Sequence, residues 1–333
     1  MTTLATELQD RVSRLQGLLV KSGVHAALLL MPADIYYFSG TRQNSALWLP
    51  SEGVPVLFVR KSMVRAREEC LAAEVRPFPS SREFEREIPN EQLRIGMTFD
   101  AVPIQQHGYY SRVLPGREFT DISTFVRETR SVKTPFELEQ LRNSADMLAS
   151  VFTEVPEFLR EGMRELDLAA EMEYRLRRKG HEGFVRMRAF NQELFGGMAV
   201  SGGGAACGFF DGAVTGRGLS SASPQGASLE LIRANEPVLL DFAGIRNGYI
   251  TDMTRMFVIG DLDHELRRAF GVSLDIQEAV RTAMVPGAIC EELYMMAVSM
   301  AEKEGLGHCF MGMPGEQSRF VGHGVGLELD ELP

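Results

Sequence analysis

The dipeptide Asn247-Gly248 lies between two β-rich runs, one from Pro237 to Gly244 and one from Tyr249 to Ile259. Asn-Gly at this place predicts a two-residue hairpin turn, because both residues adopt positive φ angles readily. The sequence therefore predicts an antiparallel hairpin over residues 237–259. Any fold for this part of the chain must include that hairpin.

Apolar residues at helical spacing flank the hairpin in pairs. The first helix opens on a capping-box pattern, in which Thr134 and Glu137 each satisfy a free backbone N–H of the other. The expected elements, in order, are a helix from 134 to about 156, a helix over 166–179, the hairpin, helices near 262–285 and 290–304, and a strand over 321–329. If the two halves are related, a hairpin is missing at the end.

The first 130 residues alternate between helical and strand patterns. The expected elements are a helix over 4–22, a strand over 26–31, a hairpin of 46–49 with 55–59, a strand over 94–98 and a helix over 122–129. With 333 residues the chain is long enough for two domains. We expect a small α/β domain over residues 1–131 and a second domain over residues 132–333.

Charge and composition exclude several classes of protein. The net charge is −10 without a basic stripe, which disfavours nucleic acid as a partner. No run of eighteen apolar residues occurs, and the N-terminus lacks the pattern of a signal peptide. The cysteines show no metal-binding or disulfide spacing, which favours a reducing, cytoplasmic location; they are Cys70, Cys207, Cys290 and Cys309.

A glycine- and serine-rich stretch from Gly202 to Gly226 predicts a long loop with Phe209, Phe210 and Asp211 in its middle. Loops of this length inside a domain are uncommon, and most are either functional or disordered. The sequence leaves both outcomes open.

Asp241 and Asp252 stand on the two arms of the predicted hairpin. A turn near Arg246–Gly248 makes them cross-strand neighbours, with Cα atoms about 4.5–5.5 Å apart. Like charges at that spacing destabilise a sheet, and a divalent cation with oxygen ligands would remove the repulsion. Two other readings stay open: one Asp ends a strand in solvent, or Arg255 neutralises the pair.

His323 lies in the segment Gly322-His-Gly-Val-Gly326. Flanking glycines let the backbone approach a site closely, and imidazole is a common metal ligand. A histidine in a plain glycine-rich turn has the same pattern, so these residues alone leave the choice open.

Taken together, these motifs resemble the aminopeptidase P, prolidase and creatinase family. The resemblance rests on Asp-Phe-Ala-Gly, then Asn-Gly-Tyr-x-x-Asp-Met-Thr-Arg, then Gly-His-Gly-Val-Gly-Leu about seventy residues later. Two other segments are similar to the family's domain junction and N-terminal domain: Arg-Ser-Val-Lys-Thr-Pro-Phe-Glu, and Asp34-Ile-Tyr-Tyr-Phe-Ser-Gly40. The resemblance covers essentially the whole chain.

The resemblance implies a fold and a site. The fold is a small creatinase-like α/β domain followed by a pita-bread domain, an α+β architecture. The site implied by the resemblance holds two divalent cations (Mn, Co or Zn), with Asp241, Asp252 and His323 among their ligands. Family members are commonly dimers, so a homodimer acting on small peptides is expected.

The chain departs from the family pattern at three places. The family's two glutamate ligands lie on a hairpin after the Gly-His-Gly segment, and Glu328 and Glu331 are too close to His323 to be those ligands. The pita-bread domain is therefore expected to be incomplete at Pro333, and residues 1–333 to turn over peptides poorly. Asp330 occupies the position of a family histidine that handles protons and substrate, which makes it a catalytic candidate.

The third departure is a missing substrate histidine before the first aspartate strand. Between His181 and His264 the sequence has no histidine, and the loop with Phe209, Phe210 and Asp211 occupies the region. These three residues are therefore candidates for substrate contact. The expected function is a metal-dependent hydrolase of small peptides, Xaa-Pro peptidase-like, with altered specificity. The alternatives are a non-catalytic pita-bread domain that binds peptides or proteins, and a creatinase-like C–N hydrolase.

Overall fold

The computed structural model describes residues 3–89, 91, 93–188, 196–208 and 214–332. It divides into two compact units. The N-terminal unit contains residues 1–140, 186–193 and 324–333, and the second unit contains residues 141–185 and 194–323. The predicted domain limits, 1–131 and 132–333, stay a prediction.

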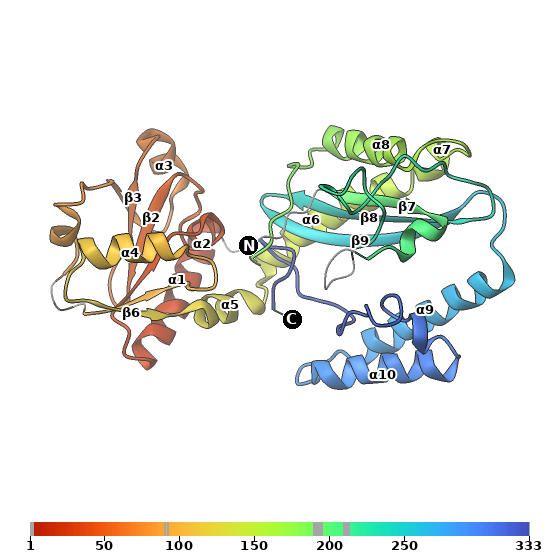
Figure 1. Ribbon diagram of the computed structural model, residues 1–333. Helices are drawn as coiled ribbons and strands as arrows, with labels where there is room; N and C mark the ends of the chain where they lie inside the picture. The colour runs from red at the N-terminus through yellow and green to blue at the C-terminus, as the bar shows by residue number, and fades with distance from the viewer. Residues whose placement is uncertain (1–2, 90, 92, 189–195, 209–213, 333) are drawn as a thin grey trace. The chain divides into compact units, whose positions relative to one another are not determined.

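The N-terminal unit is built on a six-stranded mixed sheet in the order β4-β3-β2-β1-β5-β6 (Figure 1). The strands are β1 (Ala26–Leu29), β2 (Ser45–Pro50), β3 (Val56–Val59), β4 (Glu74–Pro77), β5 (Arg94–Met97) and β6 (Glu118–Asp121). Antiparallel pairing joins β1 to β2 and β2 to β3, which confirms the expected hairpin of β2 with β3. Parallel pairing joins β1, β5 and β6, so their carboxyl ends meet at one edge.

Helices cover this sheet. They are α1 (Leu4–Lys21), α2 (Pro32–Ser39), α3 (Met63–Glu69), α4 (Ile104–Val113), α5 (Ser123–Ser131) and the 3-10 turn η1 (Phe84–Glu87). The first predicted helix is confirmed as α1, and its residues Leu8, Val12, Leu15 and Leu19, which recur at helical spacing, are all buried. Phe84 and Tyr110 pack on the sheet residues Trp48 and Phe58 in one core.

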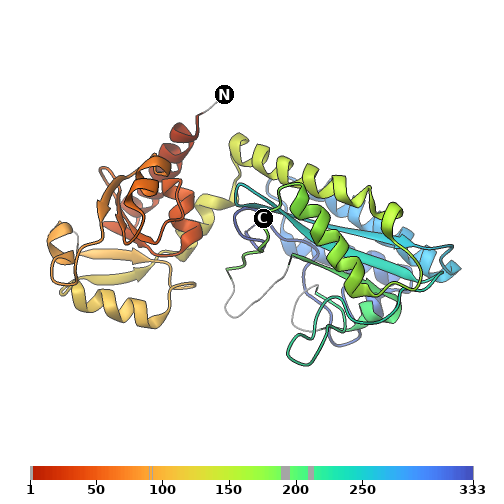
Figure 2. The same cartoon turned by 90° about the horizontal axis from the view of Figure 1, so that it is seen from above.

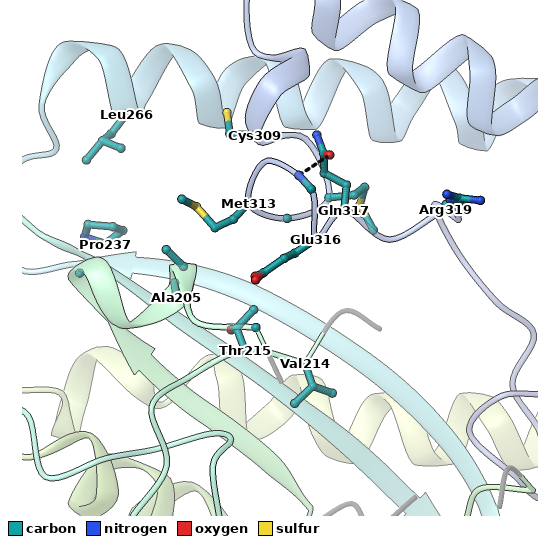
Figure 3. Close-up of a pocket in the computed structure, with 16 residues that line it drawn as sticks. Ala205, Val214, Thr215, Pro237, Leu266, Cys309, Met313, Glu316, Gln317 and Arg319 are labelled. Atoms are coloured by element: carbon teal, nitrogen blue, oxygen red, sulfur yellow. Dashed lines mark hydrogen bonds between the residues drawn. The ribbon is translucent and has the colours of Figure 1, made fainter. Parts of the chain in front are cut away.

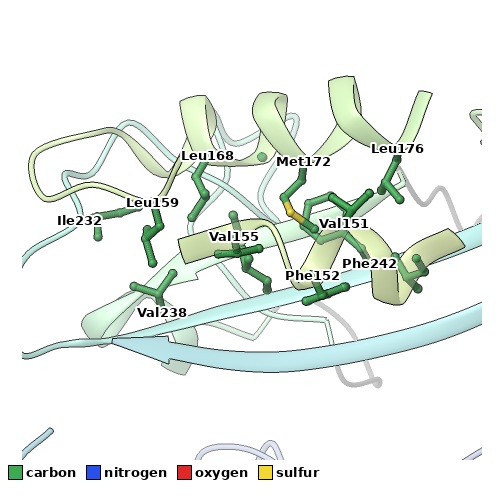
Figure 4. Packing of buried hydrophobic residues seen from close by; sticks show 14 residues of the cluster. Val151, Phe152, Val155, Leu159, Leu168, Met172, Leu176, Ile232, Val238 and Phe242 are labelled. Atoms are coloured by element: carbon green, nitrogen blue, oxygen red, sulfur yellow. The ribbon is translucent and has the colours of Figure 1, made fainter. Parts of the chain in front are cut away.

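The second unit contains a three-stranded antiparallel sheet in the order β7-β8-β9. The strands are β7 (Gly197–Ser201), β8 (Pro237–Arg246) and β9 (Tyr249–Val258); the helices on this sheet are α6 (Pro135–Phe152), α7 (Val155–Phe158) and α8 (Glu165–Arg178). Helices α6 and α8 lie along one face of the sheet when it is viewed from above (Figure 2). Figure 4 shows the core between these helices and the sheet, where Phe152, Met172 and Phe242 meet.

The remaining elements are a helix pair, α9 (His264–Ala283) and α10 (Cys290–Lys303), and two 3-10 turns, η2 (Gly202–Ala206) and η3 (Gly307–Cys309). The helix pair has a small core of Ile276, Ala297 and Ala301. None of the helices in the described ranges has the length and apolar content needed to cross a membrane.

One strand was not predicted, and one local prediction was wrong. Strand β7 ends at Ser201, immediately before the predicted loop of residues 202–226, and its residues Met198 to Ser201 pair with β8 and are buried. The expected strand over 321–329 does not form among the described residues. Glycines at 322, 324 and 326 weaken the strand, and this segment closes on itself through paired hydrogen bonds between Gly324 and Glu331.

Candidate metal centre

The hairpin brings Asp241 and Asp252 to the same face of the sheet. The turn consists of Asn247 and Gly248 alone, with φ angles of 50° and 80°, as a type I′ turn requires. Arg246 therefore pairs with Tyr249, and the register places Asp241 opposite Thr254 and Asp252 opposite Ala243. The two aspartates are diagonal neighbours. The expectation that they face each other directly was wrong, because the residue opposite Asp241 lies two positions beyond Asp252 on β9.

Diagonal neighbours on one face still lie within reach of each other's side chains. Loss of hydration, followed by the charge of the neighbouring Asp252 carboxylate and a side-chain hydrogen bond with it, raises the pKa of Asp241 to about 7. The Thr254 hydroxyl donates a hydrogen bond to Asp241 Oδ1 at 2.9 Å and acts in the opposite direction. The pair thus holds two carboxyl groups that resist being ionised together.

The repulsion between the two carboxylates indicates whether a cation fits the site. Two carboxylates on one face that repel each other, one of them short of water, form the donor set that hard divalent cations prefer. A cation between them would remove the repulsion that raises the pKa of Asp241. Asp241 and Asp252 therefore fit a divalent metal ion.

Arg255 does not neutralise the aspartate pair. It pairs with Leu240, one position away from Asp241, and side chains at successive positions point to opposite faces of a sheet. Its guanidinium donates to the Thr254 carbonyl oxygen at 2.8 Å. One of the two alternatives for the aspartates is thereby excluded.

His323 approaches the aspartates from the C-terminal part of the second unit. Its Nε2 lies 3.7 Å from Asp252 Oδ2, and both side chains are about one-third exposed, at 34% and 33%. The structure thus brings together three residues that span 82 positions of the sequence. Within the described ranges, however, no three His, Cys, Asp or Glu side chains form a group with metal-site geometry. His323 lies beside the pair without completing a ligand set.

The search for site residues in the sequence missed Thr254. This threonine lies directly opposite Asp241, and its hydroxyl fixes one carboxylate oxygen. The signal was present in the sequence, since Thr254 follows Asp252 by two positions and so points to the same face. Only the register shows that its partner is Asp241.

Asp330 belongs to the N-terminal unit, where its carboxylate accepts a hydrogen bond from the Arg188 backbone N–H at 3.2 Å. Its catalytic role stays a prediction. The other substrate candidates, Phe209, Phe210 and Asp211, lie outside the described residues.

Glu328 and Glu331 are committed to ion pairs in the N-terminal unit. Arg130 Nη2 lies 2.8 Å from Glu328 Oε2 and 2.5 Å from Glu331 Oε1, and Lys133 Nζ lies 2.7 Å from Glu331 Oε2. These side chains are almost fully buried apart from Lys133. Both carboxylates are thus paired with cationic side chains of the same unit.

The second unit also contains a cavity of about 960 Å³ (Figure 3). One wall comes from the glycine-rich loop (residues 202–226) and the other from residues 309–319. Pro237 at the start of β8 and Leu266 of α9 complete the lining. The walls combine apolar side chains with Thr215, Glu316 and Arg319, a mixture typical of small-molecule sites.

Comparison with known proteins agrees with this fold. Residues 139–333 match the model of metallopeptidase family M24, and residues 11–132 match that of the creatinase/prolidase N-terminal domain. A Xaa-Pro dipeptidase of Pyrococcus furiosus is 25% identical over 98% of this chain and 84% of its own length. One from Lactobacillus delbrueckii subsp. lactis is 25% identical over 97% of this chain and 83% of its own length.

Solved structures share the fold. The prolidase from Pyrococcus horikoshii OT3 superimposes with a TM-score of 0.79 at 22% identity, covering 97% of this chain and 84% of the other. The X-Pro aminopeptidase from Thermotoga maritima MSB8 gives 0.78 at 24% identity, with 97% and 83% covered. These similarities confirm the predicted fold class: a creatinase-like α/β domain followed by a pita-bread fold.

The family match and the similar Xaa-Pro dipeptidases define the class of a metallopeptidase-like hydrolase. The chain belongs to metallopeptidase family M24, within the aminopeptidase P and prolidase group that its motifs resemble. Membership implies peptide hydrolysis with divalent metal ions.

Proposed function

We propose that this protein hydrolyses small peptides of the Xaa-Pro type, as an aminopeptidase or dipeptidase, with a specificity altered from that of its relatives. The observation that carries the proposal is the aspartate pair on one face of the β8–β9 hairpin, with the raised pKa of Asp241. The similar Xaa-Pro dipeptidases support the substrate class. The altered specificity rests on Asp330 and on the lack of a histidine between His181 and His264.

In the proposed site Asp241 and Asp252 hold a divalent cation, with His323 as a further ligand. Mn, Co and Zn are the candidates. The bound metal would polarise a peptide carbonyl and make water more acidic. Thr254 keeps one oxygen of Asp241 oriented, and Asp330 would accept a proton or bind the substrate amine. Phe209, Phe210 and Asp211 are proposed to contact the substrate. A cytoplasmic location and a homodimer complete the proposal.

Metal binding is the first test. Mn²⁺, Co²⁺ and Zn²⁺ are titrated into the protein by calorimetry, and into Asp241→Asn and Asp252→Asn. We expect binding that weakens by about tenfold or more in each variant, because each loses a charged ligand. Asp275→Asn, an exposed position on α9, is the matched control. Equal affinity in all four proteins would disprove the role of the pair.

Peptide turnover is the second test. Xaa-Pro dipeptides, Xaa-Pro-initiated peptides and matched peptides without proline are assayed with each metal. Hydrolysis of the proline peptides that disappears in Asp252→Asn supports the proposal.

Two other results would replace the proposal. Peptide binding without hydrolysis would support the non-catalytic alternative. The observation in its favour is that, among the described residues, His323 does not complete a set of three metal ligands with the aspartates. Metal-independent hydrolysis of a non-peptide C–N bond would support the creatinase-like alternative.

A further inference from the structure

The carboxylate of Glu165 is buried at the start of α8, where the residue is only 1% exposed. Its Oε1 accepts hydrogen bonds from the backbone N–H of Ser201 at 2.6 Å and from the Ser201 hydroxyl at 2.8 Å. Its Oε2 accepts from the N–H of Ser228 at 2.9 Å and from the Ser228 hydroxyl at 2.7 Å. These four donors replace water around a charge that would otherwise be costly to bury.

The two serines stand at the two ends of the glycine-rich loop. Ser201 is the last residue of β7, and Ser228 follows the loop by two positions. Backbone contacts support the same arrangement, since the N–H of Leu166 donates to the Ser228 carbonyl at 3.0 Å and the N–H of Glu165 to the Glu230 carbonyl at 3.0 Å. Both ends of the loop are thus held at the first turn of one helix.

The described parts of this loop form one wall of the 960 Å³ cavity. They contribute Gly202, Ala205, Ala206, Gly208, Val214 and Thr215. In Figure 3, Ala205, Thr215 and Val214 line this side, across from Met313 and Glu316. The position of the wall therefore depends on where the loop begins and ends.

We propose that Glu165 is a positioning residue, which holds both ends of the glycine-rich loop so that the loop forms the wall of the cavity. The role in peptide binding rests on the proposed function, but the role in holding the loop does not. A carboxylate suits this role because each of its two oxygens accepts from two donors. Glutamine would place an NH₂ group against the N–H of one serine, which cannot turn to accept a hydrogen bond.

Glu165→Gln tests this role, with Glu173→Gln as the matched control on the exposed face of the same helix. Hydrogen exchange is measured by mass spectrometry over residues 196–208, 214–230 and 264–303. Alkylation of Cys207, which lies in the loop and is half-buried, is timed with iodoacetamide. Cys309 is exposed in the opposite wall and serves as the internal reference.

Glu165→Gln should raise both exchange near Ser201 and Ser228 and the labelling of Cys207 by about tenfold. That factor corresponds to about 1.4 kcal/mol, just below the usual contribution of a hydrogen bond to a charged group. Helices α9 and α10, the labelling of Cys309 and the Mn²⁺ affinity should not change. KM for a Xaa-Pro dipeptide should rise where turnover is measurable. A protein without any peptidase activity would contradict the proposed function alone, because exchange and labelling still report on the loop.

An effect equal to that of Glu173→Gln, or a rise of the same size throughout the second unit, would overturn the positioning role. If Glu165→Gln does not fold, Ser201→Ala removes a single hydroxyl donor and leaves the backbone bond in place. That variant should show a smaller change confined to the same residues, and no change would count equally against the proposal.

Discussion

At the scale of single residues, the site is controlled by how far each titratable group is removed from water. The pKa of Asp241 is raised to about 7 by loss of hydration and by Asp252. The folded protein therefore binds a proton at Asp241 that the unfolded chain has released above about pH 4. A metal ion competes with that proton for the same oxygens.

Stabilisation by Mn²⁺ should consequently increase with pH. Without metal, the contribution of Asp241 to the free energy of unfolding falls as pH rises from about 4 to about 7. The rise in Tm on adding Mn²⁺ should therefore be larger at pH 8 than at pH 5.5. Thermal unfolding with and without the metal measures it, and Asp241→Asn should weaken the pH dependence. A shift of Tm that is the same at both pH values would refute this account.

His181 gives a second pH effect, which has the opposite sign. Its Nδ1 accepts the Gly183 N–H at 2.9 Å, so Nε2 carries the proton and donates to the Ala243 carbonyl at 2.9 Å. Burial lowers the pKa of this imidazole. Its contribution to stability is complete above the unfolded value of about 6.5 and is lost as pH falls through the lowered folded pKa.

His181→Gln should therefore flatten the pH dependence of unfolding between pH 7.5 and pH 5. We expect a loss of about 1 kcal/mol at pH 7.5, where the hydrogen bonds of His181 are intact, and a smaller loss at pH 5. Urea unfolding of both proteins at the two pH values measures the difference. His264→Gln, at a side chain that is 86% exposed, is the control. A loss that is greater at pH 5 would contradict the neutral tautomer.

At the scale of elements, helix α6 packs closely against strand β8 of the hairpin. Thr134 and Glu137 form the predicted capping box at the start of α6, with hydrogen bonds of 3.0 and 3.3 Å between each side chain and the other's N–H. Further along, α6 crosses β8 at Gly244, where a Cβ would lie 2.8 Å from the Ser144 carbonyl oxygen. The glycine lets the helix approach the sheet.

Gly244→Ala should destabilise the protein by about 1–3 kcal/mol, because the added methyl group meets backbone that cannot move away. Gly271→Ala in α9 is the control: nothing lies within 4 Å of the added carbon, and alanine favours the helix by about 1 kcal/mol. Denaturant midpoints of the two variants should move in opposite directions. A neutral Gly244→Ala would mean that α6 and β8 are packed less closely than described.

At the scale of the whole molecule, distant chain segments are joined in the N-terminal unit by buried charges. Arg130 pairs with Asp34 at 2.9 Å and with Glu331, which is 201 positions further along the chain. Arg188 pairs with the same Asp34 at 3.0 Å and with Asp100 at 2.7 Å. The network binds the segment after His323 to the N-terminal unit.

Arg130→Met should destabilise this unit by about 3–5 kcal/mol, because it leaves three buried carboxylates short of a counter-charge. Arg65→Met, at a side chain that is 67% exposed, should change stability by less than about 1 kcal/mol. Urea unfolding monitored through Trp48, the only tryptophan, reports on this unit. Comparable effects of the two substitutions would show that the network contributes little.

Local patterns in the sequence were sufficient to predict most elements. The helix face of Leu8 to Leu19, the capping box at Thr134 and the Asn247-Gly248 turn all depend on neighbours within a few positions, so each could be predicted without knowing the fold. The motifs around Asp241, Asp252 and His323 were likewise sufficient to indicate the family.

Only the tertiary structure determined which side chains meet. The diagonal placement of Asp241 and Asp252, and the pairing of Asp241 with Thr254, depend on a register that one residue in the turn would alter. The bonds of Glu165 to Ser201 and Ser228 join residues 36 and 63 positions apart, and no local pattern encodes contacts at that range. Burial has the same origin, because how much water a carboxylate loses depends on every element that packs around it.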